Sequence, residues 1–168
     1  VFEVFETEDS MPNHKNAKEL SDFKSAIELR DVVFKYENEN ILTGFSLAVK
    51  KGQTVALVGQ SGSGKSTIAS LLTRFYDLEK GSIRIDGIDI RKFSKSSLRS
   101  QIGLVTQDSI LFNNSIKNNL KVGNENATDK ELIEALKVAN AWEFVKDLPD
   151  GIETNIGDAG NSLSGGQK

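Results

Sequence analysis

The chain has 168 residues, enough for one domain with its own core and well below the length at which single cores split. Its 21 basic and 24 acidic side chains give a net charge of −3, which argues against a strongly basic nucleic-acid binder and against an acidic disordered tail. The absence of Cys excludes disulfides, thiol catalysis and Cys-ligated metals, and the single His14 excludes a multi-histidine metal cluster.

Residues 1–25 are polar and charged with little periodicity, which predicts a linker. The chain starts at Val1 and stops at Lys168 directly after a Gly-rich motif. We therefore expect it to be an internal piece of a longer protein.

Three segments in the first third of the chain are predicted to be strands. Residues 27–36 (IELRDVVFKY) are rich in β-formers, and residues 45–49 alternate apolar with small or polar side chains. Residues 54–58 (TVALV) form a short continuous apolar run, which is typical of a strand buried on both faces.

The middle of the chain mixes helix and strand signals. Residues 68–75 carry apolar side chains at helical spacing, and residues 82–90 alternate around Asp86-Gly87, which predicts a hairpin. A short helix over residues 97–101 and a second buried strand over residues 102–106 follow.

Beyond Gln107 the pattern predicts helices. Thr128 and Glu131 have the spacing of a capping box at the start of a helix. A further helix is predicted over residues 141–148, where Pro149 stops it.

The strongest motif lies directly after the apolar run of residues 54–58. It matches the phosphate-loop pattern G-x-x-x-x-G-K-[ST], in the strand-then-helix context that this motif requires. Glycines let backbone N–H groups turn toward phosphate oxygens, and the following helix N-terminus favours an anion. The residues predicted to bind the phosphates are Gly59, Gln60, Ser61, Gly62, Ser63, Gly64, Lys65, Ser66 and Thr67.

Two of these residues have specific predicted roles. Lys65 supplies a full positive charge to the β- and γ-phosphates, and the Ser66 hydroxyl is placed to ligate Mg²⁺.

A second motif surrounds Ser164, which stands 99 residues after Lys65. It comprises Leu163, Ser164, Gly165, Gly166 and Gln167, and together with the phosphate loop it resembles the LSGGQ signature of ATP-binding-cassette (ABC) ATPases. By this resemblance, Tyr36 matches the aromatic residue that stacks on adenine, and Gln107 matches the Q-loop glutamine that reaches the Mg²⁺ and the attacking water.

Finer matches resemble the exporter branch of that family. Residues 107–112, continuing to Ser115, Ile116 and Asn119, are similar to the exporter Q-loop segment, and residues 154–160 are similar to the loop before the signature. Ala159 departs from that loop, where an Arg is usual, which puts in doubt a charge contact of this loop with the membrane domain.

The resemblance covers residues 26–168 and implies an α/β fold of the P-loop NTPase, ABC ATPase type. It implies an incomplete core sheet, an antiparallel β subdomain and phosphate-loop core over residues 26–106, and a Q-loop and helical signature subdomain over residues 107–168. Residues 1–25 would link this part to a preceding membrane domain.

The resemblance further implies an ATPase, with ATP and Mg²⁺ as cofactors, that couples ATP hydrolysis to export across a membrane. The expected partners are a transmembrane domain in the same polypeptide and a second nucleotide-binding domain in a head-to-tail dimer, in which residues 163–167 serve the partner's ATP. The location is then the cytoplasmic face of a membrane, without a nucleic-acid partner.

Two alternatives stay open. One is a soluble ABC ATPase acting on nucleic acid or the ribosome, against which the net charge counts. The other is a regulatory module that binds nucleotide without turnover. The Asp-Glu strand and the switch histidine, which the family places after the signature, are not among these residues, so no catalytic residue is assigned and the chain alone is expected to be inactive. Strands that flank residues 54–58 in the family are also absent, and we expect open apolar edges there.

Overall fold

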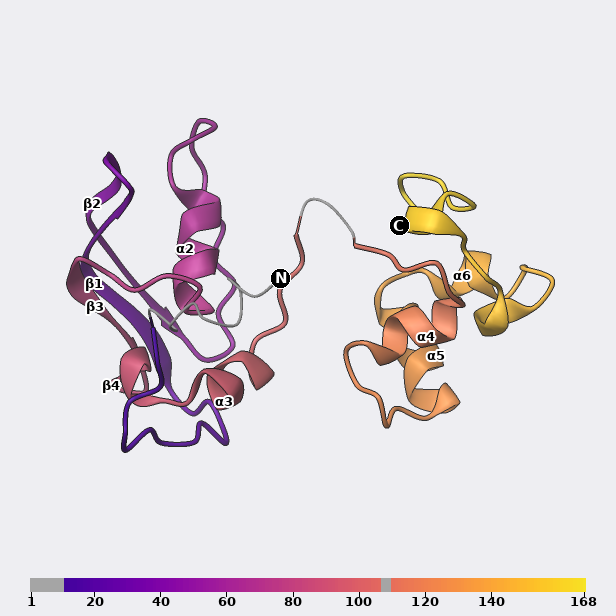
Figure 1. Ribbon diagram of the computed structural model, residues 1–168, viewed down its shortest axis with the longest axis horizontal. Coiled ribbons are helices and arrows are strands. Elements are labelled where there is room, and N and C mark those ends of the chain that lie inside the picture. Colours follow the sequence, from indigo (N-terminus) through magenta and orange to yellow (C-terminus); the bar gives the residue numbers. More distant parts are fainter. Residues whose placement is uncertain (1–10, 107–109) are drawn as a thin grey trace, which may run out of the picture. The chain divides into compact units, whose positions relative to one another are not determined.

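The computed structural model describes residues 11–106 and 110–168. The chain divides into two compact units, Val1–Leu104 and Val105–Lys168, which are coloured indigo to rose and orange to yellow in Figure 1. The first unit holds a sheet with two helices, and the second holds short helices only among its described residues.

The sheet of the first unit is antiparallel and has the strand order β2-β1-β3-β4. Its strands are β1 (Ala26–Tyr36), β2 (Glu39–Lys50), β3 (Lys80–Ile85) and β4 (Ile88–Asp89). The strand predicted over residues 27–36, the strand predicted over residues 45–49 and the hairpin around Asp86-Gly87 are therefore confirmed, as is the antiparallel β subdomain. The strand containing residues 45–49 begins earlier than predicted: β2 starts at Glu39, and only two residues separate it from the end of β1.

A bulge in β1 sets which of its side chains face the core. Leu29 and Val32 are both buried although they lie three positions apart, which strict alternation does not allow. The pairing with β2 shifts between these two residues, and Asp31 has φ 47° and donates its N–H to Ser46 Oγ at 2.9 Å. The extra residue returns the later part of β1 to the core-facing register.

Helix α2 (Lys65–Leu72) lies beside the sheet in Figure 1, and it packs its apolar side against the strands. Ile68 and Leu71 of α2 belong to the same buried cluster as Leu29 and Ile83 of the sheet and Leu98 of α3 (Lys95–Ser100). The 3-10 turn η1 (Ile90–Lys92) joins β4 to α3. Helix α2 ends before residue 75, where the sequence pattern placed its end, because Arg74 adopts φ 53°.

Two predicted strands do not form. Residues 54–58 and 102–106 pair with no strand among the residues that the structure describes. Val58 is 91% exposed and Val105 is 97% exposed. The prediction that both segments are buried strands is wrong for this chain, whereas the expectation of open apolar edges at residues 54–58 agrees with the exposure. A strand forms only where a neighbouring strand accepts and donates its backbone hydrogen bonds, and among the described residues no segment pairs with either run.

Residues 11–25 lie along the first unit. Leu20 is buried in the core cluster, and its N–H donates to Ser97 Oγ at 3.0 Å. Lys18 forms a parallel bridge with Phe93, and the Ser94 N–H donates to the Lys18 carbonyl at 2.9 Å. The part of the expected linker that is described is thus packed against η1 and α3.

The second unit is built from α4 (Ile116–Lys121), α5 (Asp129–Val138), α6 (Trp142–Val145), η2 (Gly151–Glu153) and η3 (Asp158–Gly160). Its buried centre contains Ile116, Leu136, Val145 and Ile156. The capping box at the start of α5 is confirmed, since the Thr128 side chain accepts from the Glu131 N–H and the Glu131 carboxylate accepts from the Thr128 N–H. Helix α6 is shorter than the predicted residues 141–148.

None of the helices within residues 11–106 and 110–168 combines the length and apolarity needed to cross a bilayer.

Candidate functional site

The predicted phosphate loop leads directly into α2, and β2 fixes its position. Gly64 is the N-cap residue of α2 and has φ 86°, a left-handed conformation that favours glycine. A Cβ on Gly64 would lie 2.8 Å from Leu42 Cδ2 and 3.2 Å from Ile41 Cγ2. The loop therefore turns where the side chains of β2 leave room only for a hydrogen atom.

The N-terminus of α2 is open to an anion. Its first intrahelical bond runs from the Ile68 N–H to the Gly64 carbonyl at 3.0 Å, and among the described residues no side chain caps the helix. The N–H groups of Lys65, Ser66 and Thr67 thus belong to an uncapped first turn, where the helix dipole adds partial positive charge. Such a turn at the end of a glycine loop is suited to a phosphate.

The Lys65 ammonium lies against the loop itself. Its Nζ donates to the carbonyls of Gly59 at 2.9 Å and Gln60 at 2.7 Å, and to Ser63 Oγ at 3.2 Å. These contacts use the three donors of a lysine ammonium and hold its charge beside the loop. The structure therefore brings the loop and the predicted phosphate-binding cation together.

The fit to a divalent cation rests on Ser66. Ser66 is exposed in the first turn of α2, next to Lys65, and its hydroxyl is a hard oxygen ligand of the kind that Mg²⁺ accepts. Thr67 is buried, so only its backbone remains suited to a ligand role. Gln107, the other predicted metal-site residue, lies outside the described residues. Within the described ranges no group of three or more His, Asp or Glu side chains could hold a metal ion.

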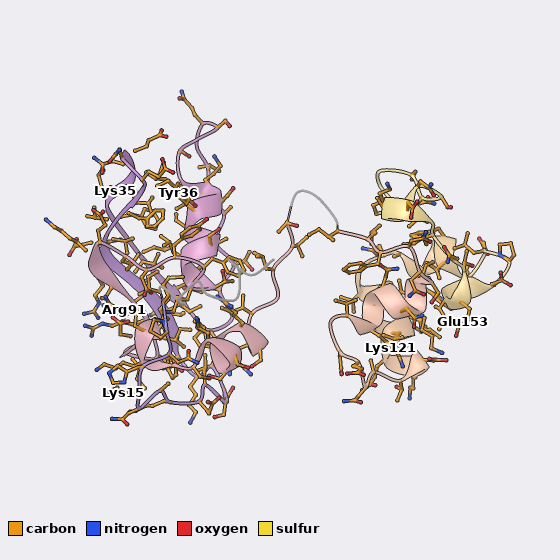
Figure 2. The ribbon with its side chains drawn as sticks, in the orientation of Figure 1. Lys15, Lys35, Tyr36, Arg91, Lys121 and Glu153 are labelled. Atoms are coloured by element: carbon orange, nitrogen blue, oxygen red, sulfur yellow. The ribbon has the colours of Figure 1, made fainter. Side chains whose placement is uncertain are left out.

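Tyr36 stands at the end of β1, beside an open pocket of about 970 Å³ that Phe34 and Tyr76 also line. Its ring makes T-shaped contacts with Phe34 at 4.8 Å and with Tyr76 at 5.1 Å between centroids. Tyr36 is 36% exposed. In Figure 2 its side chain is drawn on the side of the strands that faces α2. Of the described residues that line the pocket, none belongs to the loop of residues 59–67.

The predicted signature residues form an exposed turn in the second unit. The Ser164 N–H donates to Gln167 Oε1 at 2.9 Å, and the Gln167 N–H donates to the Ser164 carbonyl at 3.0 Å. Leu163 packs against the buried cluster of that unit. A Cβ on Gly165 or Gly166 would meet no atom of residues 11–106 or 110–168 within 4 Å, so these glycines present bare backbone at the surface.

The loop before the signature is held by local contacts. Asn113 Nδ2 donates to Asp158 Oδ1 at 2.6 Å, and Lys168 Nζ donates to the Ala159 carbonyl at 2.8 Å. Ala159, where the exporter pattern has Arg, adopts φ 50°. The segment is therefore a tight turn with a non-glycine residue in the left-handed region.

Sequence reasoning missed two contributors to this site. Tyr76, which contacts the Tyr36 ring, follows α2 closely, and the two adjacent aromatic residues Phe75 and Tyr76 were the available sequence signal. Leu42, which limits Gly64, belongs to no sequence motif; it reaches the loop because β2 and α2 pack in the same core cluster.

Comparisons with known proteins bear on the same residues. A family profile described as ABC transporter matches residues 42–168. The chain is 51% identical over 154 residues to ABC transporter B family member 21 of Arabidopsis thaliana, covering 90% of this chain and 12% of that protein. It is 47% identical to a putative multidrug export ATP-binding/permease protein of Bacillus subtilis, covering 100% of this chain and 29% of the relative.

Two further similarities point the same way. An ATP-dependent lipid A-core flippase of Desulfotalea psychrophila is 44% identical over 168 residues, covering 100% of this chain and 29% of the flippase. The solved structure of a bacterial Atm1-family ABC exporter with ATP bound superposes with a TM-score of 0.93 at 42% identity, covering 99% of this chain and 30% of that one. The chain thus spans less than a third of the length of these relatives.

The phosphate loop on an uncapped helix, the antiparallel β subdomain and the exposed signature turn are therefore found in one sequence that a family profile matches over most of its length. The chain belongs to the ABC transporter family and corresponds to the ATP-binding part of its exporter-type members.

Proposed function

We propose that this chain binds MgATP in a full-length exporter and that binding and hydrolysis there drive a substrate across a membrane. The observation that carries the proposal is the Lys65 ammonium beside the uncapped N-terminus of α2, in a chain 42% identical to an exporter with ATP bound. Relatives that are ATP-binding/permease proteins support a transmembrane domain in the same polypeptide.

In this proposal each part of the loop has a distinct task. The backbone N–H groups of the first turn of α2 donate to the phosphates, and Lys65 exchanges loop acceptors for phosphate oxygens. Ser66 and Gln107 would hold Mg²⁺, which when bound would neutralise phosphate charge. Tyr36 stacks on the adenine with its exposed ring surface. Phosphoryl transfer depends mainly on such positioning and charge stabilisation.

The signature turn acts on a second copy of the site. Residues 163–167 face the ATP of a partner nucleotide-binding domain in a head-to-tail dimer, and the exposed backbone of Gly165 and Gly166 is suited to approach a phosphate closely. Both domains then lie at the cytoplasmic face of the membrane.

The 168-residue chain by itself does not turn over ATP in this proposal. In the family, the Asp that helps hold the metal and the Glu that polarises the attacking water come from a strand after the signature, and of the 168 residues only Lys168 follows residues 163–167. Phosphate release by the purified chain that disappears in a Lys65→Ala variant would refute this part.

The full-length protein provides the main test. ATP-driven substrate uptake into inside-out membrane vesicles is expected, and Lys65→Ala should abolish both ATP binding and uptake. Gly165→Ala should leave ATP binding by each domain intact and reduce turnover, because the partner's signature acts only in the closed dimer. ATP binding without any turnover by the full-length wild-type protein would favour a regulatory module instead.

A further inference from the structure

Three aromatic rings meet where the end of β1 faces the segment after α2. Tyr36 and Tyr76 contact at 5.1 Å with an interplanar angle of 84°, and Tyr36 and Phe34 contact at 4.8 Å with an angle of 90°. Phe34 also contacts Tyr76 at 5.6 Å. Two neighbours perpendicular to the Tyr36 ring, from different parts of the chain, restrain the plane in which that ring lies.

The three rings differ in exposure. Phe34 is 4% exposed and belongs to the core, whereas Tyr36 is 36% and Tyr76 is 44% exposed at the open pocket. Phe34 therefore forms the floor, and the two tyrosines form a pair that faces solvent. We call Tyr36 and Tyr76 the tyrosine pair.

Two guanidinium groups fix the segment that carries Tyr76. Arg74, whose side chain is 5% exposed, donates from Nε to Asp77 Oδ1 at 3.0 Å and from Nη2 to Asp77 Oδ2 at 3.3 Å, so this fork spans Tyr76. Arg99 of α3 donates from Nε to the Thr73 carbonyl at 3.0 Å and from Nη2 to the Arg74 carbonyl at 2.9 Å.

Arg99 also holds the residue before Tyr76. Its guanidinium lies 4.9 Å from the centroid of the Phe75 ring, on which it stacks as a cation. Bidentate hydrogen bonds to a carboxylate or to two carbonyls hold the planar guanidinium of an arginine in one orientation. A surface tyrosine held on both sides in this way has a defined position, unlike an ordinary exposed aromatic residue.

We propose that Tyr76 is a positioning residue for the nucleotide base: it holds the Tyr36 ring in the orientation that stacks on a purine. This inference rests on the proposed role of Tyr36 and adds a second residue to it. Tyr76 acts through Tyr36, so its removal should weaken binding of ligands that carry a base and leave the phosphate contacts unchanged.

The test uses the full-length protein and two ligands, ATP and inorganic triphosphate, which lacks the base. Tyr76→Ala should weaken ATP binding by about two- to tenfold, the range that a lost aromatic pair represents, and leave triphosphate affinity unchanged. The KM for ATP should rise while kcat at saturating ATP stays constant. Tyr76→Phe retains the ring and should restore wild-type ATP binding.

A double-mutant cycle separates positioning from independent binding. In the Tyr36→Ala background, Tyr76→Ala should cause little further loss of ATP affinity, because the ring that it positions is gone. Tyr76→Leu keeps apolar bulk and guards against misfolding of the alanine variant. Val138→Ala in α5, a position 85% exposed, serves as the matched surface control.

Three outcomes overturn the inference. If Tyr36→Ala weakens ATP binding and neither Tyr76→Ala nor Tyr76→Leu does, the role of Tyr76 is refuted while that of Tyr36 stands. If a Tyr76 variant weakens triphosphate as much as ATP, the residue is merely structural. If Tyr36→Ala leaves the affinity for both ATP and GTP unchanged while Lys65→Ala abolishes ATP binding, the assignment of the base site to Tyr36 fails, and the inference with it.

Discussion

The carboxylate of Asp86 accepts the backbone N–H of Ser25 at 2.6 Å, although the two residues are 61 positions apart. The same side chain accepts the N–H groups of Lys24 at 2.8 Å and Ala26 at 3.0 Å. Asp86 lies in the turn between β3 and β4, and residue 26 starts β1. The Asp86 side chain thus holds the segment that leads into β1 against the turn between β3 and β4.

Replacing Asp86 should loosen that entry segment. An amide oxygen is a weaker acceptor than a carboxylate, so Asp86→Asn should destabilise the unit by about 1 kcal/mol, comparable to the loss of a helix-capping side chain. Hydrogen exchange at residues 24–26, corrected for intrinsic rates, should accelerate in the variant. Asp22→Asn is the control, because the Asp22 carboxylate lies 4.0 Å from the Lys51 ammonium at an exposed position; equal exchange in both variants would contradict the assigned role.

The same contact predicts a pH dependence. Partial burial tends to raise the pKa of Asp86, but the backbone hydrogen bonds from Lys24, Ala26 and Ser25 outweigh it and hold the pKa below its usual value. A carboxyl with a lowered folded-state pKa stabilises the fold above its unfolded pKa, near 3.9, and this stabilisation is lost as the pH falls through the folded-state pKa. Protection of residues 24–26 should therefore fall below about pH 4 in the wild type. Asp86→Asn should show no such step.

Two glycine substitutions should separate a steric effect from a functional one. Gly64→Ala places a Cβ 2.8 Å from Leu42 Cδ2 at φ 86°, so the loop must shift and ATP affinity should drop at least tenfold. In Gly165→Ala the added Cβ meets no described atom within 4 Å, so the thermal midpoint and ATP affinity of the domain should stay at wild-type values. Calorimetric titration of both variants checks this, and retained ATP binding in Gly64→Ala would contradict the geometry of the loop.

Ala159 provides a test of backbone strain. A φ of 50° brings steric strain for a residue with a Cβ and none for glycine. Ala159→Gly should therefore be neutral or stabilise the second unit by up to about 1 kcal/mol. Thermal melts of the full-length protein measure the effect. Ala127→Gly is the comparison, since Ala127 has no positive φ and is buried, and it should destabilise. A loss of stability in Ala159→Gly equal to that in Ala127→Gly would show that the turn is not strained.

The chain in isolation should be marginally stable and prone to aggregate. Val58 and Val105 are almost fully exposed, next to the phosphate loop and at the start of the second unit respectively. Exposed apolar segments without strand partners favour association between chains. Light scattering during a thermal ramp should show irreversible aggregation, and Val58→Lys with Val105→Lys should reduce it. A reversible two-state melt of a monomeric wild-type chain would contradict this expectation.

The sequence alone determined the features that depend on local chemistry. The phosphate loop can be predicted from the sequence because its residues stand at fixed spacings. Gly64 and Lys65 must be adjacent if the backbone turn and the cation are to contact the same phosphate. The capping box of Thr128 and Glu131 is readable for the same reason, since both of its hydrogen bonds lie within four residues. The hairpin at Asp86-Gly87 likewise follows from two adjacent residues.

Tertiary structure alone decided the features that need partners from distant parts of the chain. The apolar run of residues 54–58 reads as a buried strand, but a strand exists only where neighbours pair with it, and among the described residues there are none. Tyr76 contacts Tyr36, and Leu42 excludes a side chain at Gly64, because the sheet and α2 pack in one core. No local sequence pattern indicates that packing. Local periodicity specifies which face of an element is apolar. Which other element packs against that face depends on the tertiary fold as a whole.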